Sequence, residues 1–276
     1  MLNFDTINYW SEIKLDIVKD YATAYSKILT TQTFIKEHDY IDAFAGAGVH
    51  LSKESGKLIP GSPLNALEIT PPFKKLYLID MDKDKYESLK QLTKDKPNVS
   101  VYKGDCNEVL LKEVFPKVRY EDFRRGLCLL DPYGLHLNWE VIAKAGQMKS
   151  LEIFLNFPVM DMNQNVLWHN TERVDATQAS RMDAFWGDAS WKKAVYETQG
   201  NFFGWEEKVV DSNTAIANAF QKRLKEVGGF SYVPEPIPMR NSKGATVYYL
   251  FFASQNTVGA KIVEDILNKY RDRGKN

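Results

Sequence analysis

The run Tyr40-Ile-Asp-Ala-Phe-Ala-Gly-Ala-Gly48 constrains the fold more than any other part of the sequence. An apolar strand ends in Asp42 and leads into two closely spaced glycines, Gly46 and Gly48. Glycine suits such a turn because the backbone must bend sharply off the strand and approach a ligand closely, and a Cβ atom would block either step. The run therefore predicts a nucleoside-binding α/β domain.

The glycine spacing disfavours two common kinds of nucleotide site. The third glycine of the dinucleotide fingerprint would fall at position 51, where the chain has Leu51, so a nicotinamide or flavin cofactor is not expected. No Gly-Lys-Ser or Gly-Lys-Thr follows the run, so a phosphate-binding P-loop is not expected either.

After this run, strand and helix patterns alternate along the chain. The strands are nearly continuous runs of Leu, Ile, Val, Phe and Tyr, which is typical of a parallel sheet with helices on both faces. Ligands of such sheets bind beyond the carboxyl ends of the strands. The turn Asn241-Ser-Lys-Gly244 should join the last two strands as an antiparallel hairpin. Strands are predicted at 76–79, 99–102, 127–130, 151–157, 233–239 and 246–254, and helices at 64–69, 83–92, 107–114, 138–145, 214–227 and 258–270.

We expect one domain, residues 1–276, with two additions to this core. Apolar residues at helical spacing over about 10–30 predict an amphipathic helix, so residues 1–37 would form an N-terminal helical cap. Residues 49–61 are polar and unperiodic, and we expect a loop that could act as a lid. Residues 161–210 hold four of the six tryptophans and are predicted to be a helical insertion that binds substrate. These tryptophans could instead form a small hydrophobic core of their own.

Composition and charge narrow the classes of partner. Lys plus Arg and Asp plus Glu both number 36, so the formal net charge is zero and nucleic acid could bind only through a local patch. The two cysteines, Cys106 and Cys128, are too few and too far apart for a zinc site or a disulfide framework. The four histidines lack metal-ligand spacing, so no metal is expected. Without a long apolar run or a leader, we expect a cytoplasmic protein that does not bind membranes.

Four predicted strands end on or near an aspartate: Asp42, Asp80, Asp105 and Asp131. Because strand ends meet at one edge of a parallel sheet, these carboxylates should line a common crevice. Asp80 is placed to accept hydrogen bonds from both ribose hydroxyls, and Asp105 could accept one from the exocyclic amine of an adenine. Aspartate is also a favoured helix cap, and that structural role stays open for both residues.

The turn Asp131-Pro-Tyr-Gly134 is the most chemically suggestive of these strand ends. Asp, Pro and Gly at its first, second and fourth positions also suit an ordinary β-turn. In the functional interpretation, the Asp131 carboxylate and the Pro132 carbonyl accept both hydrogens of a planar NH2 group, while Tyr133 or Trp139 stacks on the attached base. Such a clamp would aim the nitrogen lone pair at an electrophile, which is catalysis by orientation and electrostatics.

Together these motifs resemble those of class I S-adenosylmethionine-dependent methyltransferases over about residues 38–160. More narrowly, nearly the whole chain resembles the bacterial three-Cys-motif partner proteins (TcmP). The resemblance implies a Rossmann-like α/β fold, a seven-stranded, mostly parallel sheet with an antiparallel C-terminal hairpin, and S-adenosylmethionine as cofactor. It also implies an association with a radical-SAM-like protein that bears three cysteines. The narrower match is carried by Gly61-Ser-Pro63, by Asp131-Pro-Tyr-Gly134 with Trp139, and by Met160-Asp-Met-Asn-Gln-Asn-Val-Leu-Trp168.

The resemblance further implies roles for individual residues. Three would contact the methionine part of the cofactor, one its ribose and one its adenine: Asp42, Gly46 and Gly48, then Asp80, then Asp105. Phe44 and Cys106 are also expected to bind the cofactor. Three would act on the methyl acceptor and four would bind the rest of the substrate: Asp131, Pro132 and Tyr133, then Trp139, Asn156, Pro158 and Trp168.

The expected function is methylation of an amino nitrogen of a nucleobase in DNA or RNA. One departure bears on this: adenine amino-methyltransferases usually show Asp-Pro-Pro-Tyr, whereas this chain has Tyr133 and Gly134 at the last two positions. Two alternatives stay open. The protein could be a non-catalytic subunit that binds S-adenosylmethionine and works with the three-cysteine protein, or it could methylate a small molecule.

Overall fold

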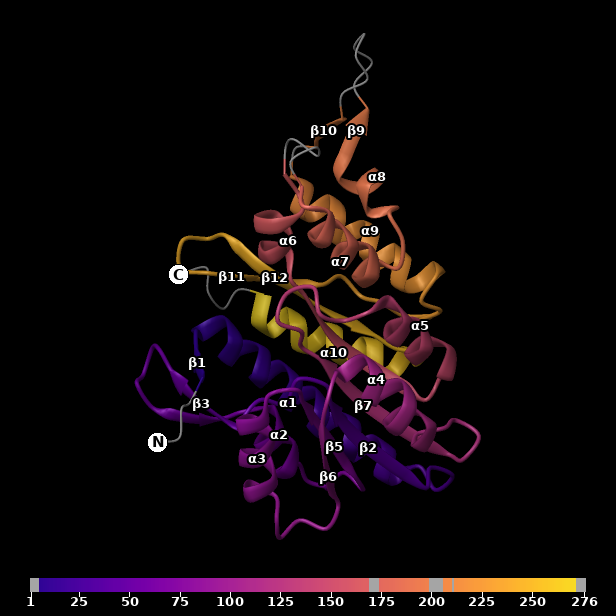
Figure 1. Ribbon diagram of the computed structural model, residues 1–276. Helices are drawn as coiled ribbons and strands as arrows, with labels where there is room; N and C mark the ends of the chain where they lie inside the picture. Colours follow the sequence, from indigo (N-terminus) through magenta and orange to yellow (C-terminus); the bar gives the residue numbers. More distant parts are fainter. Residues whose placement is uncertain (1–4, 169–173, 199–205, 210, 272–276) are drawn as a thin grey trace.

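The computed structural model describes residues 5–168, 174–198, 206–209 and 211–271 (Figure 1). Its centre is a seven-stranded sheet. The five strands of this sheet that come first in the sequence run parallel, and the two strands of the C-terminal hairpin pair antiparallel. This confirms the Rossmann-like α/β fold predicted from the sequence. From one edge to the other, the sheet contains β11 (Ile237–Arg240), β12 (Thr246–Ala253), β8 (Leu151–Phe157), β7 (Arg124–Leu130), β2 (Glu37–Asp42), β5 (Leu76–Asp80) and β6 (Val99–Lys103).

The strand order places a natural ligand crevice at β2. This strand pairs with β5 on one side and with β7 on the other, so the chain proceeds outward from β2 in both directions. In open α/β sheets such a switch point leaves a crevice at the carboxyl ends of the strands. The residues that follow β2, β5, β6 and β7 therefore meet at one edge.

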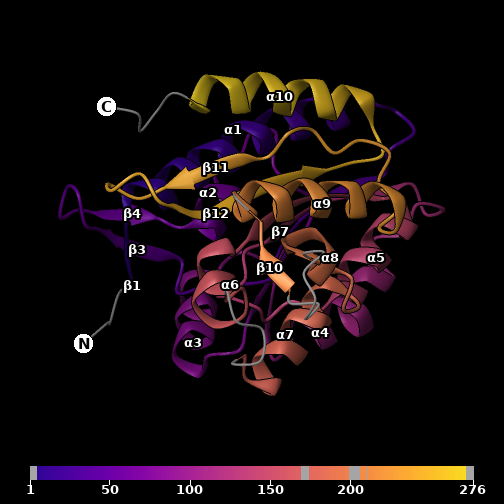
Figure 2. The same ribbon diagram turned by 90° about the horizontal axis from the view of Figure 1, so that it is seen from above.

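Helices cover both faces of the sheet, as the view from above shows (Figure 2). Successive strand residues point to opposite faces, so Tyr40 joins the buried cluster on one face and Ile41 the cluster on the other. Strands buried on both sides need apolar residues at nearly every position, which explains their continuous runs. The first face carries α1 (Tyr9–Thr31), α2 (Ser62–Leu67), α3 (Lys83–Leu92) and α10 (Thr257–Arg271). The second carries α4 (Cys106–Val109), η1 (Leu110–Val114), η2 (Phe115–Lys117), α5 (Trp139–Met148) and α9 (Ser212–Glu226).

The predicted N-terminal helix is present as α1, which lies beside α10 (Figure 1). Its buried residues recur at helical spacing and include Ile17, Tyr21 and Tyr25. The Tyr21 ring meets Phe252 of β12 edge-on, with 4.8 Å between the ring centroids. This packing fixes α1 over the sheet, so that its first turns reach the carboxyl edge of the strands.

The expected loop at 49–61 is a β-hairpin, so that prediction is wrong. Strands β3 (Val49–Ser52) and β4 (Leu58–Pro60) pair antiparallel, and β1 (Asp5–Ile7) pairs with β3 in parallel. The three form a small sheet with the order β1-β3-β4. Each strand is only three or four residues long, and half of the pairing comes from a distant segment, so local periodicity gives no signal.

The segment at 161–210 contains helices together with a short strand pair. Its described elements are α6 (Val159–Asn165), α7 (Ala176–Trp186), α8 (Trp191–Val195) and the antiparallel strands β9 (Tyr196–Thr198) and β10 (Glu206–Lys208). Trp186 and Trp191 are buried, which fits the hydrophobic-core alternative for these two residues. Trp205 lies outside the described residues.

The predicted turn between β11 and β12 is also present. The backbone N–H of Gly244 donates to the carbonyl of Asn241 at 2.9 Å. The Asn241 side chain accepts from the backbone of Lys243 at 3.0 Å and of Ala245 at 3.1 Å, which closes the hairpin. Within the described ranges, no helix combines the length and the hydrophobicity needed to cross a bilayer.

Candidate active site

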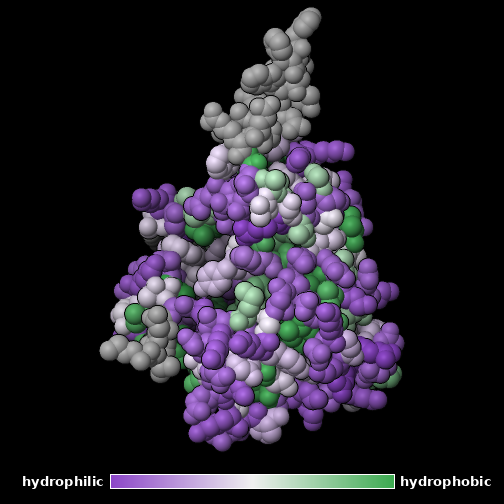
Figure 3. Space-filling model, viewed as in Figure 1, coloured by the Kyte–Doolittle hydropathy of each residue, from purple (hydrophilic) through white to green (hydrophobic). Residues whose placement is uncertain are grey.

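A cavity of about 380 Å³ lies at the carboxyl ends of β2, β5, β6 and β7. The segments that follow these strands supply its floor, and α1 and β1 supply one wall. Nine of the residues expected at a cofactor or acceptor site line it: Phe44, Gly46, Asp80, Asp105, Cys106, Asp131, Pro132, Tyr133 and Asn156. The outer surface in the view of Figure 3 is covered mainly by hydrophilic residues.

The glycine turn after β2 lines the cavity at Gly46. Its φ of +65° is a conformation that side chains rarely adopt, and its N–H donates to Asp80 Oδ2 at 2.9 Å. Gly48 has a φ of +85°, and a Cβ there would come within 2.9 Å of Leu92 Cδ1. The positive φ is therefore what favours glycine at position 48, since the exposed Leu92 side chain could move, and Gly48 does not line the cavity.

Asp42 lies beneath the glycine turn, so the expected direct contact with the cofactor is not what the structure shows. Its side chain has no exposed surface. It accepts hydrogen bonds from the Phe44 N–H at 3.3 Å and from the Tyr40 hydroxyl at 3.4 Å. Burial raises the pKa of Asp42 to about 7. Asp42 therefore shapes the turn from below, and Phe44 reaches the cavity.

Asp80, at the end of β5, links the turn to the next strand. One carboxylate oxygen accepts from Gly46, and the other accepts from the N–H of Asp82 at 2.8 Å. Each carboxylate oxygen can accept a second hydrogen bond, so Asp80 keeps acceptor capacity on the cavity side. The helix cap here is Asp82, which accepts from the N–H groups of Asp84 and Lys85 at 2.9 and 3.0 Å.

Asp105 combines both interpretations offered by the sequence. Its Oδ1 atom caps α4 by accepting from the Asn107 N–H at 2.7 Å, and the residue also lines the cavity. Cys106 lines the cavity beside it. Burial raises the pKa of Cys106 to about 12, so the thiol stays protonated and serves as an apolar contact.

The turn after β7 brings Asp131, Pro132 and Tyr133 to the cavity. Gly134 permits the turn because its φ is +62° and a Cβ would lie 2.8 Å from the Asp161 carboxylate. The side chain of Asn107 holds the segment that follows: it donates to the His136 carbonyl at 3.0 Å. The same side chain accepts from the Asn138 N–H at 2.7 Å.

Asp131 has two partners from distant parts of the chain. Asn156 of β8 donates to its Oδ1 atom at 2.8 Å. The ammonium of Lys14, on α1, forms an ion pair with its Oδ2 atom, and the Lys14 side chain is only 8% exposed. The sequence analysis missed Lys14. The signal in the sequence was that Lys14 falls on the same helical stripe as Val18, Tyr21 and Tyr25. All of these side chains are buried, and a charge on a buried stripe needs a partner.

The N-terminal segment lines the cavity at Asp5, next to Lys85 and Tyr133. Asp5 of β1 pairs with Lys85 of α3 at 2.6 Å, and the Lys85 ammonium lies 5.6 Å from the centroid of the Tyr133 ring. His50 of β3 also lines the cavity. Burial lowers the pKa of His50, so its ring is neutral at pH 7. Tyr248 of β12 lines the cavity as well, and nothing in the sequence indicated that it would lie there.

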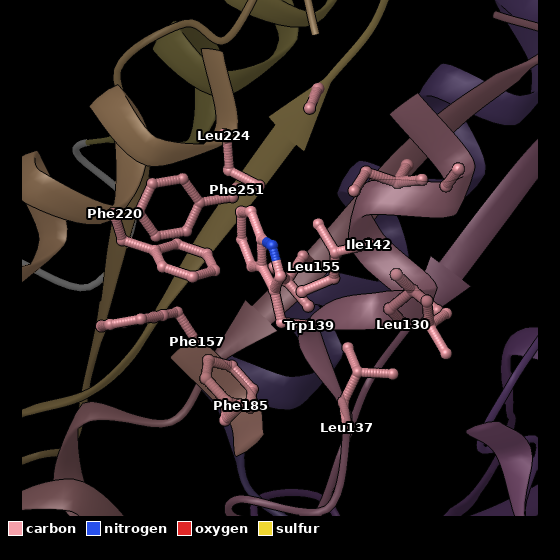
Figure 4. Packing of buried hydrophobic residues seen from close by; sticks show 14 of the residues in the cluster. Leu130, Leu137, Trp139, Ile142, Leu155, Phe157, Phe185, Phe220, Leu224 and Phe251 are labelled. Atoms are coloured by element: carbon pink, nitrogen blue, oxygen red, sulfur yellow. The ribbon is translucent and has the colours of Figure 1, made fainter. Parts of the chain in front are cut away.

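Three expected substrate residues lie outside this cavity. Trp139 is 8% exposed and packs in the core, where its ring meets Phe220 edge-on at a centroid distance of 6.0 Å (Figure 4). Pro158 is buried just before α6. Trp168 is partly exposed, and its Nε1 atom donates to the Gln164 carbonyl at 2.8 Å. None of the three lines the cavity.

The carboxylates that line the cavity accept hydrogen bonds and carry negative charge, which fits a nucleoside that carries a positive charge. Its volume falls within the range of about 300–1,000 Å³ that is typical of small-molecule sites. Carboxylates outnumber ammonium groups on its wall, with Asp5, Asp80, Asp82, Asp105 and Asp131 against Lys14 and Lys85. Over the described ranges, no three His, Cys, Asp or Glu side chains are grouped as metal ligands.

No family model and no curated protein matches this sequence. Among solved structures, a Legionella pneumophila protein of family DUF519 is 13% identical with a TM-score of 0.48, covering 94% of this chain and 93% of its own. A putative methyltransferase from Thermobifida fusca is 12% identical with a TM-score of 0.45, covering 89% and 80%. TYW2 of M. jannaschii, solved in complex with AdoMet, is 10% identical with a TM-score of 0.34, covering 84% and 74%. These similarities are distant, so function must be argued from the cavity itself.

Proposed function

We propose that this protein is an S-adenosylmethionine-dependent methyltransferase that acts on an amino nitrogen. The observation that carries the proposal is the convergence of Asp80, Asp105 and Asp131, from the ends of three parallel strands, on one cavity beside the Gly46 turn. That edge of a parallel sheet is where nucleoside ligands bind. The carboxylates on its wall favour a cationic ligand, and the cofactor, when bound, supplies a methyl group on a positively charged sulfur.

The lining residues divide into a cofactor part and an acceptor part. We assign Asp80 to the ribose hydroxyls and Asp105 to the adenine amine, because both keep a carboxylate at the cavity after making their structural hydrogen bonds. Asp131 and the Pro132 carbonyl would accept the two hydrogens of the amino group to be methylated. Holding that nitrogen in line with its target is the main catalytic task, since no covalent enzyme intermediate is required.

A nucleobase is the acceptor that we propose first. Tyr133 is 71% exposed next to Asp131 and Pro132, so its ring is available to stack on a planar base. A small-molecule amine is the second candidate, because the excess of carboxylates around the cavity would repel the phosphates of a nucleic acid. A third alternative is that the protein transfers no methyl group. It would then bind the cofactor as a non-catalytic subunit of a three-cysteine radical-SAM-like protein.

Cofactor binding is the first test. Isothermal titration calorimetry with S-adenosylmethionine should show a single site, and Asp80→Asn should weaken it about 10- to 100-fold, because the ribose would lose charge-assisted hydrogen bonds. Asp84→Asn is the matched control, since Asp84 lies in the same connection but does not line the cavity. Absence of binding to the unaltered protein at millimolar cofactor would refute the proposal.

Methyl transfer is the second test. Tritiated S-adenosylmethionine should label one of two separate pools: nucleic acids (DNA, tRNA and rRNA) or small-molecule amines. Asp131→Ala should abolish labelling while calorimetric binding of the cofactor survives. Normal turnover in that variant removes Asp131 from the acceptor role. Tight binding with no transfer to any pool supports the non-catalytic alternative.

A further inference from the structure

Lys14 is a buried cation at a place where an apolar residue would suffice. It lies on α1 on the stripe that continues with Val18, Tyr21 and Tyr25, and all four side chains are buried. A buried charge is costly unless it is paired. Replacing a buried ion pair by apolar side chains of similar size is often neutral or stabilising, so stability alone does not explain Lys14.

The Lys14 ammonium is also bound to the carboxylate of Asp131, which the proposed reaction needs. It pairs with Asp131 Oδ2 while Asn156 donates to Oδ1, so both carboxylate oxygens already have a donor. An incoming amino group would have to share each oxygen with a donor already bound there, and one of those donors carries a full positive charge. A second anion beside Lys14 would weaken that competition.

The proposed cofactor carries such an anion, the α-carboxylate at the end of its methionine part. Among the described residues that line the cavity, Lys14 and Lys85 alone carry an ammonium group. Lys85 is held by Asp5 at 2.6 Å, next to the Tyr133 ring. Lys14 contacts Asp131, where the transferable methyl group must arrive, and the methionine carboxylate is only a few bonds from that methyl group. Lys14 is therefore the better placed of the two cations.

We propose that Lys14 binds the α-carboxylate of the cofactor and thereby leaves Asp131, which becomes free to accept the amino group of the methyl acceptor. This inference rests on the proposed function and deepens it. Cofactor binding would prepare the acceptor site, so the cofactor binds before the acceptor. In the protein without cofactor, the ion pair with Lys14 weakens the binding of other amines to Asp131.

The test compares two ligands that differ only in the carboxylate, S-adenosylmethionine and its decarboxylated analogue. In calorimetry, Lys14→Met should weaken S-adenosylmethionine by about tenfold or more and change the analogue by less than about twofold. Methionine keeps an unbranched side chain of similar length, so packing is retained. Lys85→Met is the control and should leave the ratio of the two affinities unchanged. Equal weakening of both ligands, or of neither, overturns the assignment.

A second variant, at Asp131, tests whether Asp131 and the cofactor carboxylate compete for Lys14. Asp131→Asn removes the negative charge that holds Lys14. Both ligands lose the attraction of that charge for their sulfonium, so the readout is the ratio of the two affinities, and we expect it to shift several-fold in favour of S-adenosylmethionine. An unchanged ratio, or a shift toward the analogue, contradicts the release of Asp131. If the unaltered protein binds neither ligand, the proposed function fails. If it binds both and the ratio ignores Lys14, only this inference fails.

Discussion

At the scale of single residues, the aspartates at the strand ends combine structural and chemical roles. Asp105 caps α4 with one oxygen and still faces the cavity, so the cap and the ligand contact expected from the sequence are compatible. Asp131 differs because its partners, Lys14 and Asn156, come from other elements. A sequence shows that an aspartate ends a strand, but it does not show which distant side chains meet it.

The turn that carries Asp131 should be sensitive at Gly134. Gly134→Ala combines a φ of +62° with a Cβ only 2.8 Å from the Asp161 carboxylate. Gly56→Ala is the control, since Gly56 has a φ of +65° and nothing within 4 Å of its added Cβ. In urea unfolding, we expect the control to lose about 1 kcal/mol and Gly134→Ala to lose about 2–3 kcal/mol. Equal losses would show that Asp161 moves aside freely.

At the scale of elements, the sequence predicted what local periodicity determines. The bounds of α3 and β8 agree with the predicted 83–92 and 151–157. The β1-β3-β4 sheet was missed because its short strands are stabilised by pairing between distant segments. Trp139 was expected at the site because it comes shortly after the Asp131–Gly134 turn, and only the packing of α5 against α9 shows that its ring faces the core.

The role of Trp139 can be separated from substrate binding. Its ring packs against Phe220, and the guanidinium of Arg223 lies 4.6 Å from its centroid. Trp139→Ala should therefore lower the free energy of unfolding by about 3–5 kcal/mol. Trp168→Ala, at a position 41% exposed, should lower it by less than about 1 kcal/mol. A stable Trp139→Ala protein with a raised KM for its acceptor would restore the stacking role that the sequence suggested.

At the scale of the whole molecule, the centre of the sheet contains two buried carboxyl groups on β2. Burial raises the pKa of Asp39 from 3.8 to about 7, and it raises that of Asp42 to the same value. The folded protein therefore holds these protons more tightly than the unfolded chain does. Their contribution to stability is complete below about pH 4 and is lost as the pH rises through about 7.

Asp39 allows this dependence to be measured away from the cavity. The free energy of unfolding in urea should fall between pH 5 and pH 8.5, by an amount on the order of 3 kcal/mol for each buried carboxyl group. Asp39→Asn should remove about half of that slope, whereas Asp84→Asn on the exposed start of α3 should leave it unchanged. Identical slopes in both variants would show that Asp39 is ionised in the folded protein.

The cavity joins residues that are far apart in the sequence, with Asp5 and Lys14 on one wall, Asp131 on the floor, and Tyr248 of β12 beside them. Translation makes these parts in that order. A nascent chain that has already produced every strand-end aspartate still lacks β12, the strand that covers the edge of β8. A fragment that ends before β12 therefore lacks Tyr248 at the cavity and leaves the edge of β8 without a neighbouring strand.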